Sequence, residues 1–142
     1  MVEKFLEGKG ALITGGASGF GKGVARAFAE KGADLVLVDN NNQLLQQTTK
    51  DLTTQTGRKI VPIVCDVSKF DQVEAMAKQA FNELENIYIL FNNAGISLGY
   101  RKDFIKIDED LYDLTMNVNL KGQRSMQKNE IPKISTFSRE DH

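Results

Sequence analysis

The stretch ALITGGASGFGKG, residues 11–23, runs from four residues of a short buried strand straight into five glycines, with no proline. Glycine lacks a Cβ and adopts left-handed backbone angles readily, so this cluster predicts a turn that something approaches closely. A turn between a buried strand and a helix can present backbone amides and the helix dipole to a phosphate group. A tight packing bend is the alternative, and the turn alone does not separate the two.

Beyond this turn, apolar runs alternate with segments of helical periodicity as far as residue 122. We expect strands at residues 10–14, 33–39 and 59–67 and in the run 86–95, each followed by a helix, the last over 108–123. Ser68 and Asp71 resemble a capping box before the third helix. Because Pro62 cannot donate to a ladder, the third strand should lie at a sheet edge. The helical stripes expected to face the core contain Val24, Ala27, Phe28 and Lys31, then Leu44, Leu45, Thr48 and Leu52, then Val73, Met76, Ala77, Ala80, Phe81 and Leu84.

The four strands are continuously apolar, which indicates a parallel sheet covered on both faces by the crossover helices. The predicted fold class is therefore α/β, a doubly wound parallel sheet that stops after the fourth strand and its following helix. Residues 123–142 hold Pro132 and few apolar side chains, and we expect a polar tail there.

Composition narrows the classes of function. The 142 residues have a hydrophobic fraction of 41% and a formal net charge of -1, with Lys and Arg scattered, so nothing predicts a nucleic-acid partner. No apolar run approaches the roughly 20 residues that cross a membrane, and we expect a cytoplasmic protein without a membrane partner. The single cysteine, Cys65, should be a small buried side chain, and no metal site is expected.

Asp39 ends the second strand, 18 positions after Gly21 (39 minus 21). A carboxylate there can accept hydrogen bonds from both hydroxyls of an adenosine ribose and would repel the additional phosphate of NADP, which favours NAD. An isolated Asp at this place would more often cap the next helix. Residues 17 and 18 supply no cation for a 2′-phosphate, although Lys22 lies nearby.

Five motifs in order, TGGASGFG, LVLVD, CDVS, LFNNAG and NVNLKG, resemble the short-chain dehydrogenase/reductase family over residues 5–122. The resemblance implies a Rossmann-like, incomplete NAD-binding domain over residues 1–122 and a divergent tail over 123–142. It also implies that the first turn binds the cofactor, that Asp39 reads the ribose, that Asp66 and Val67 border the adenine, and that the NNAG loop lines the adenosine side, although a plain strand end would explain that loop alone. The implied cofactor-binding residues are Thr14, Gly15, Ser18, Gly19, Phe20, Gly21, Asp39, Asp66, Val67, Asn92, Ala94 and Gly95.

The family's active-site asparagine matches Asn119, whose backbone the resemblance implies holds a water in a proton relay. The family also needs a Tyr as general acid/base, a Lys four residues later that favours its phenolate, and a Ser. Four residues beyond Tyr88, Tyr100 and Tyr112 come Asn, Phe and Met. The chain is thus predicted to be an NAD-dependent alcohol or ketone oxidoreductase by ancestry, a possible homo-oligomer, and inactive as given through truncation, frameshift or an alternative isoform. A non-catalytic nucleotide-binding or interaction module is the alternative.

Overall fold

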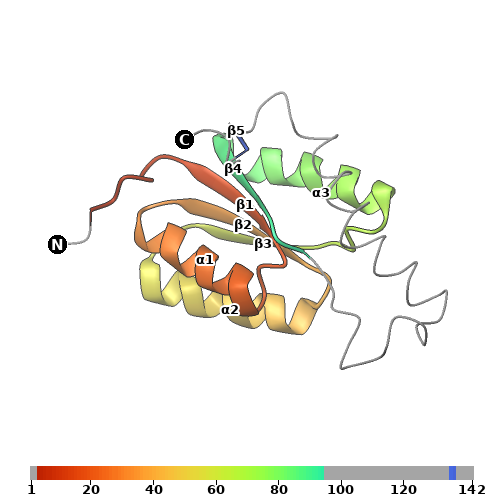
Figure 1. The fold of residues 1–142 in the computed structure, drawn as a ribbon, viewed down its shortest axis with the longest axis horizontal. Coiled ribbons are helices and arrows are strands. Elements are labelled where there is room, and N and C mark those ends of the chain that lie inside the picture. Colours follow the sequence, from red (N-terminus) through yellow and green to blue (C-terminus); the bar gives the residue numbers. More distant parts are fainter. Residues whose placement is uncertain (1–2, 95–134, 137–142) are drawn as a thin grey trace, which may run out of the picture.

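The computed structural model describes residues 3–94 and the backbone of residues 135–136. Its elements form one sheet with the strand order β3-β2-β1-β4-β5, and every neighbouring pair is parallel (Figure 1). The elements are β1 Gly10–Thr14, α1 Gly19–Glu30, β2 Asp34–Asp39, α2 Asn42–Thr56, β3 Ile60–Val64, α3 Phe70–Glu83, β4 Ile87–Asn92 and β5 Ser135–Thr136. The doubly wound parallel sheet expected from the sequence is confirmed.

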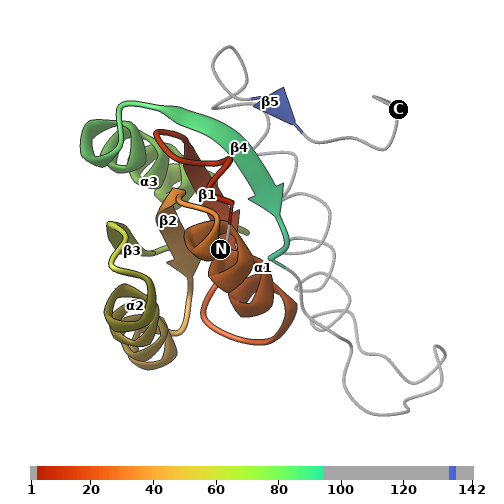
Figure 2. The same cartoon turned by 90° about the vertical axis from the view of Figure 1, so that its left-hand side faces the viewer.

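The sheet lies between two layers of helix, with α1 and α2 on one face and α3 on the other (Figure 1, Figure 2). Successive residues of β1 and β2 point to opposite faces, and all are buried except Asp34 and Asp39 at the ends of β2, which are half-buried. Leu12 and Val36 pack with α3, whereas Ile13 and Leu37 pack with α1 and α2. Continuous apolar strands in the sequence therefore have the expected cause, which is burial on both faces.

The face that α1 turns to the sheet consists of small residues. Its buried positions are Gly21, Ala25 and Ala29, while Val24 and Phe28 are half-buried and Ala27 is exposed. The stripe expected from periodicity is therefore rotated on this helix, because small side chains allow close approach to the sheet and larger ones are left at the flank. On α2 the prediction holds for Leu45, Thr48 and Leu52, but Leu44 is exposed. On α3 all the predicted positions are buried except Phe81, which is half-buried.

Helix ends follow local hydrogen bonding. The Asn41 side chain accepts a hydrogen bond from the Leu44 amide at the start of α2, and Gly57 ends that helix in the left-handed region with φ 68°. The predicted capping box at Ser68 is wrong. The Ser68 hydroxyl donates instead to the Asp66 carboxylate at 2.7 Å, and α3 begins only at Phe70. The Asp66 carboxylate also accepts from the Ser68 amide at 3.0 Å, which is the donor that Asp71 would have used in a capping box.

The sequence predicted one edge of the sheet correctly and did not predict the strand found at the other. Among the strands that the structure describes, β3, which contains Pro62, pairs only with β2, so the predicted edge position is confirmed. Beyond β4 the structure adds the two-residue β5, with Ile89 opposite Ser135, inside the segment expected to be a polar tail. Asn119, Gly95, Tyr112 and the helix expected over 108–123 lie outside the described residues. None of the helices that the structure describes has the length and apolar character needed to cross a membrane.

Candidate functional site

A cleft of about 340 Å³ opens at the carboxyl ends of the strands. Strand order reverses at β1, which has β2 on one side and β4 on the other, and ligands of open α/β sheets bind at such a reversal. The turn after β1, the end of β2, the start of α2 and the loop after β4 all contribute to the lining. The lining residues are Gly15, Ser18, Asp39, Asn40, Asn41, Leu44 and Asn93.

The glycines of the turn have different tasks. Gly15 and Gly19 have φ values of 66° and 57°, which only glycine adopts without strain. Among the described residues, no atom would lie within 4 Å of a Cβ at Gly19, so this residue borders open space there. A Cβ at Gly21 would collide with the Gly15 carbonyl and lie 2.7 Å from Asn93 Nδ2. Gly19 is therefore open to a ligand, whereas Gly21 allows α1 to pack on its own turn.

A buried hydroxyl joins the turn to the loop after β4. Thr14, with no exposed surface, donates through Oγ1 to Asn92 Oδ1 at 3.3 Å and accepts from the amides of Asn93 at 3.0 Å and Ala94 at 2.9 Å. The Asn93 side chain also donates from Nδ2 to the Gly15 carbonyl at 3.3 Å. Thr14 and Asn92, both expected at a cofactor site, thus hold two strand ends together, while Asn93 lines the cleft.

Asp39 lies half-buried in the cleft and is oriented by two backbone amides. Its Oδ2 accepts from the Ala17 amide at 3.2 Å and its Oδ1 from the Asn41 amide at 3.0 Å. A carboxylate oxygen has a further lone pair for another donor. The predicted ribose-reading position therefore carries a fixed negative charge with acceptor capacity remaining on both oxygens.

The start of α1 presents backbone amides to the same cleft. Ser18 is its N-cap residue and makes no side-chain capping hydrogen bond, and the first turn has no acidic side chain. The amides of a helix N-terminus and its dipole attract anions, so this end suits a phosphate group. Phe20 follows with 76% of its surface exposed, and its ring stacks on Phe91 with centroids 6.5 Å apart.

Asp66 and Val67 follow β3 and do not line this cleft. The Asp66 carboxylate accepts from the amide and the hydroxyl of Ser68, at 3.0 and 2.7 Å. The side chain of Val67 is 6% exposed and packs in the core on the α3 face. Asp66 is half-buried, so of these two residues Asp66 keeps the larger accessible surface.

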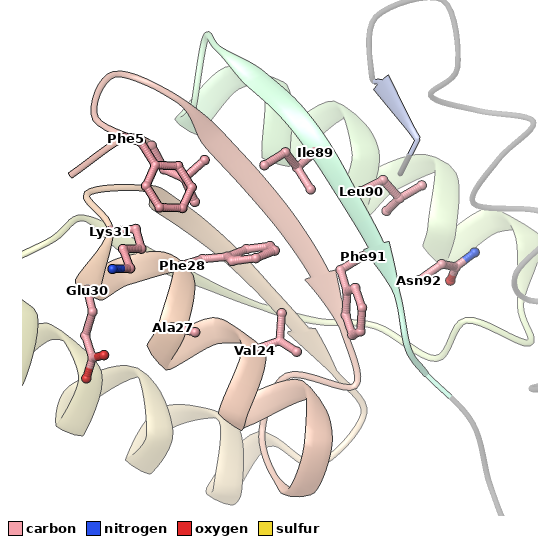
Figure 3. A pocket seen from close by; sticks show the side chains of 11 residues that line it. Phe5, Val24, Ala27, Phe28, Glu30, Lys31, Ile89, Leu90, Phe91 and Asn92 are labelled. Carbon is pink, nitrogen blue, oxygen red and sulfur yellow. The ribbon is translucent and has the colours of Figure 1, made fainter. Parts of the chain in front are cut away.

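A second hollow, a groove of about 730 Å³ between α1 and β4, has a different chemistry. The rings of Phe5, Phe28 and Phe91 surround it together with Val24 and Ile89 (Figure 3). Val24 and Phe28 are larger side chains of α1, Ile89 and Phe91 belong to β4 on the face opposite α3, and Phe5 precedes β1. Glu30, Lys31 and Asn92 also line the groove, but the glycine turn and Asp39 line only the cleft, so we place a polar ligand in the cleft.

Cys65 is buried as expected, at 2% exposure, just before Asp66. Burial, and secondarily the charge of Asp66, raises the pKa of its thiol to about 11. A thiol held neutral in this way is a poor nucleophile. Within residues 3–94, no group of three or more His, Cys, Asp or Glu side chains could hold a metal ion.

Ala17 and Thr48, which the sequence did not predict as site residues, hold the glycine turn and Asp39 in place through hydrogen bonds. Ala17 donates its amide to Asp39, and its carbonyl accepts from the Thr48 hydroxyl at 2.6 Å. Thr48 was expected only as a member of a buried stripe. A polar residue at a buried helical position was the available signal, but its partner lies 31 residues away and could not be read from spacing.

A family model described as short chain dehydrogenase matches residues 9–139. The chain belongs to the short-chain dehydrogenase family. The match continues past Gly122, where the motifs that carried the resemblance end. Membership accounts for the strand order and for the placement of the glycine turn at the β1 end.

Three known proteins illustrate the relationship. Oxidoreductase UcpA of Salmonella typhimurium is 35% identical over 130 residues, which are 91% of this chain and 48% of that protein. A short-chain dehydrogenase/reductase from Burkholderia phymatum in complex with NAD has a TM-score of 0.85 at 31% identity, covering 94% of this chain and 46% of that one. An alcohol dehydrogenase from Thermococcus sibiricus complexed with 5-hydroxy-NADP has a TM-score of 0.82 at 29% identity, over 88% and 52% of the two chains. The chain spans about half the length of the curated relatives it matches.

Proposed function

We propose that these 142 residues carry the adenosine half of a nicotinamide dinucleotide site of the short-chain dehydrogenase type, with preference for NAD over NADP. The observation that carries this proposal is Asp39, a carboxylate fixed by the Ala17 and Asn41 amides in the same cleft as the glycine turn. Related structures hold NAD or 5-hydroxy-NADP, which supports a nicotinamide dinucleotide as the ligand class.

The residues of the cleft fit such a ligand. The diphosphate would lie over the start of α1, where Gly19 leaves open space and Ser18 begins the helix. The ribose hydroxyls would donate to the remaining lone pairs of Asp39. Leu44, 45% exposed at the rim, would give the adenine an apolar neighbour. When bound, the nicotinamide ring accepts or donates a hydride, and these residues only hold the dinucleotide.

Discrimination against NADP follows from charge. A 2′-phosphate would bring its negative charges next to the Asp39 carboxylate. At a separation of about 4 Å, one pair of unit charges repels by ~4 kcal/mol at an effective dielectric constant of about 20. Solvent at this half-exposed site reduces that penalty, so we expect a preference of at least about tenfold. Lys22 is absent from the residues that line the cleft.

Hydride transfer with an alcohol or ketone is the reaction proposed for a chain that also carries a Tyr and a Lys four residues apart. No such pair occurs in these 142 residues, and Asn119 is the only residue that matches the family's catalytic set. That observation favours a second candidate function for the residues by themselves, a nucleotide-binding module without catalysis. We propose small-molecule substrates only for a chain that carries this pair.

Titration calorimetry with NAD and NADP tests the assignment on wild type, Asp39→Ala and the control Asp51→Ala. Asp51 lies on α2 and, within residues 3–94, accepts only from the exposed Gln47 side chain, so its loss changes the net charge equally and removes no residue that lines the cleft. The ratio of the two affinities is the decisive quantity, since Asp39→Ala also frees the Ala17 amide and weakens both ligands. We expect the ratio to fall to near one in Asp39→Ala alone; equal affinities in wild type would refute the assignment.

A further inference from the structure

Three threonines of α2 use their hydroxyls in two different ways. Thr53 and Thr56 donate to carbonyls four residues earlier in their own helix, at 2.7 Å each. This local bond is the usual arrangement for a helical threonine. Thr48 instead donates out of the helix, to the Ala17 carbonyl at 2.6 Å. The bond connects α2 with the glycine turn between β1 and α1.

The bond is closed off from water at both ends. Thr48 is 2% exposed and Ala17 is 3% exposed, so water cannot replace a lost partner. Removing the hydroxyl would leave the Ala17 carbonyl buried without a hydrogen bond, an arrangement that structures avoid. The turn would then shift to satisfy that carbonyl elsewhere.

The orientation of the Ala17 carbonyl determines that of the next amide. In a planar trans peptide the C=O and the following N–H point in opposite directions. The Thr48 hydroxyl draws the Ala17 carbonyl toward α2, and the Ser18 N–H therefore points away from α2. Among residues 3–94 the Ser18 N–H has no acceptor, and Ser18 lines the cleft.

The preceding peptides are fixed from the same side of the fold. The Gly16 amide donates to the Val38 carbonyl at 3.2 Å, and the Ala17 amide donates to Asp39 Oδ2 at 3.2 Å. Both acceptors belong to β2. The turn is thus held by β2 through its amides and by α2 through the single carbonyl bond from Thr48.

We propose that Thr48 is a positioning residue for the dinucleotide site: its hydroxyl fixes the peptide between Ala17 and Ser18 so that the Ser18 amide is available to a diphosphate. This inference rests on the proposed function. Thr48 is buried and touches no ligand itself, so it acts through the backbone of the turn. The contact with the ligand that depends on it is made by phosphate oxygens and not by the adenosine.

The test compares Thr48→Val, which keeps the shape and loses the hydroxyl, with Thr48→Ser, which keeps the hydroxyl. Thr53→Val is the matched control, because its hydroxyl bonds only within α2. Affinities for ADP and for adenosine are measured by calorimetry on the whole chain, with folding checked by circular dichroism. We expect Thr48→Val to weaken ADP about tenfold and adenosine much less, Thr48→Ser to restore ADP binding, and Thr53→Val to match wild type.

Equal losses for ADP and adenosine, or ADP affinity unchanged in Thr48→Val, would overturn the inference while leaving the proposed function intact. Failure of wild type to bind either ligand would overturn the proposed function instead. Amide hydrogen exchange in the free chain then tests whether the turn shifts when the Thr48 hydrogen bond is lost. We expect the Ala17 amide to exchange faster in Thr48→Val and normally in Thr48→Ser, and an unchanged Ala17 amide in Thr48→Val would overturn it.

Discussion

Replacing Gly21 by alanine should destabilise the protein even though alanine is the better helix former. Gly21 lies in the first turn of α1, and a Cβ there would collide with the Gly15 carbonyl oxygen and lie 2.9 Å from the Gly15 carbonyl carbon. The carbonyl is not free to turn away, because Asn93 Nδ2 donates to it. Relief therefore requires α1 to move from the sheet.

The magnitude follows from two opposing effects. Forcing an extra methyl group into packed surroundings costs ~1–3 kcal/mol, and replacing a helical glycine by alanine recovers ~0.5–1 kcal/mol. The net loss for Gly21→Ala is about 1–2 kcal/mol in the free energy of unfolding, equivalent to a fall in Tm of roughly 3–7 °C for a domain of this size. Displacement of α1 should also weaken NAD binding, since it moves the helix start that faces the cleft.

Gly23→Ala is the matched control in the same helix. A Cβ at Gly23 would meet no atom of residues 3–94 within 4 Å, so only the helix preference remains and the variant should gain ~0.5–1 kcal/mol. Urea unfolding followed by circular dichroism measures both variants. The close contact at Gly21 would be refuted by a Gly21→Ala variant as stable as Gly23→Ala.

Three further outcomes follow from the structure. Between about pH 9 and 11 the free energy of unfolding of wild type should fall more steeply than that of Cys65→Ala. The reason is that the folded chain keeps a thiol proton that the unfolded chain releases above the thiol pKa of 9.0. Parallel curves of unfolding free energy against pH would contradict the raised pKa. The buried Thr49 hydroxyl has no partner in the described part of the chain, so Thr49→Val should be neutral or stabilise by up to ~1 kcal/mol, and a clear fall in the urea midpoint would show that the hydroxyl has a partner. The purified 142 residues should form no NADH from NAD and alcohols above background, since a positioned general acid/base contributes about 100- to 10,000-fold to the rate. A chimera that supplies a family C-terminal half after Gly122 should be active. Turnover by the 142 residues that Asn119→Ala abolishes would contradict this prediction.

Local patterns were sufficient where one element decides its own structure. β1 was predicted with its observed limits, and β2 within one residue, because their apolar runs are buried on both faces. The end of α2 at Gly57 is likewise a local property, since the residue has left-handed angles. The spacing of apolar residues was less informative for α1. It predicted that Val24 and Phe28 face the core, whereas Ala25 and Ala29 form the buried face. Hydrophobicity marks the larger side chains, whereas close approach to the sheet selects the smaller ones.

By itself the sequence determined the order of strands and helices, the glycine turn and the acidic end of β2, because each depends on neighbours within a few residues. The partners of that turn were decided only by the tertiary structure. Asp39 meets the Ala17 amide across 22 positions, and Thr48 meets the Ala17 carbonyl across 31. Gly21 needs its missing side chain because α1 folds back over the Gly15 carbonyl. These contacts join segments that the parallel crossovers bring to one edge of the sheet, and no periodicity within a segment encodes which atoms will meet there.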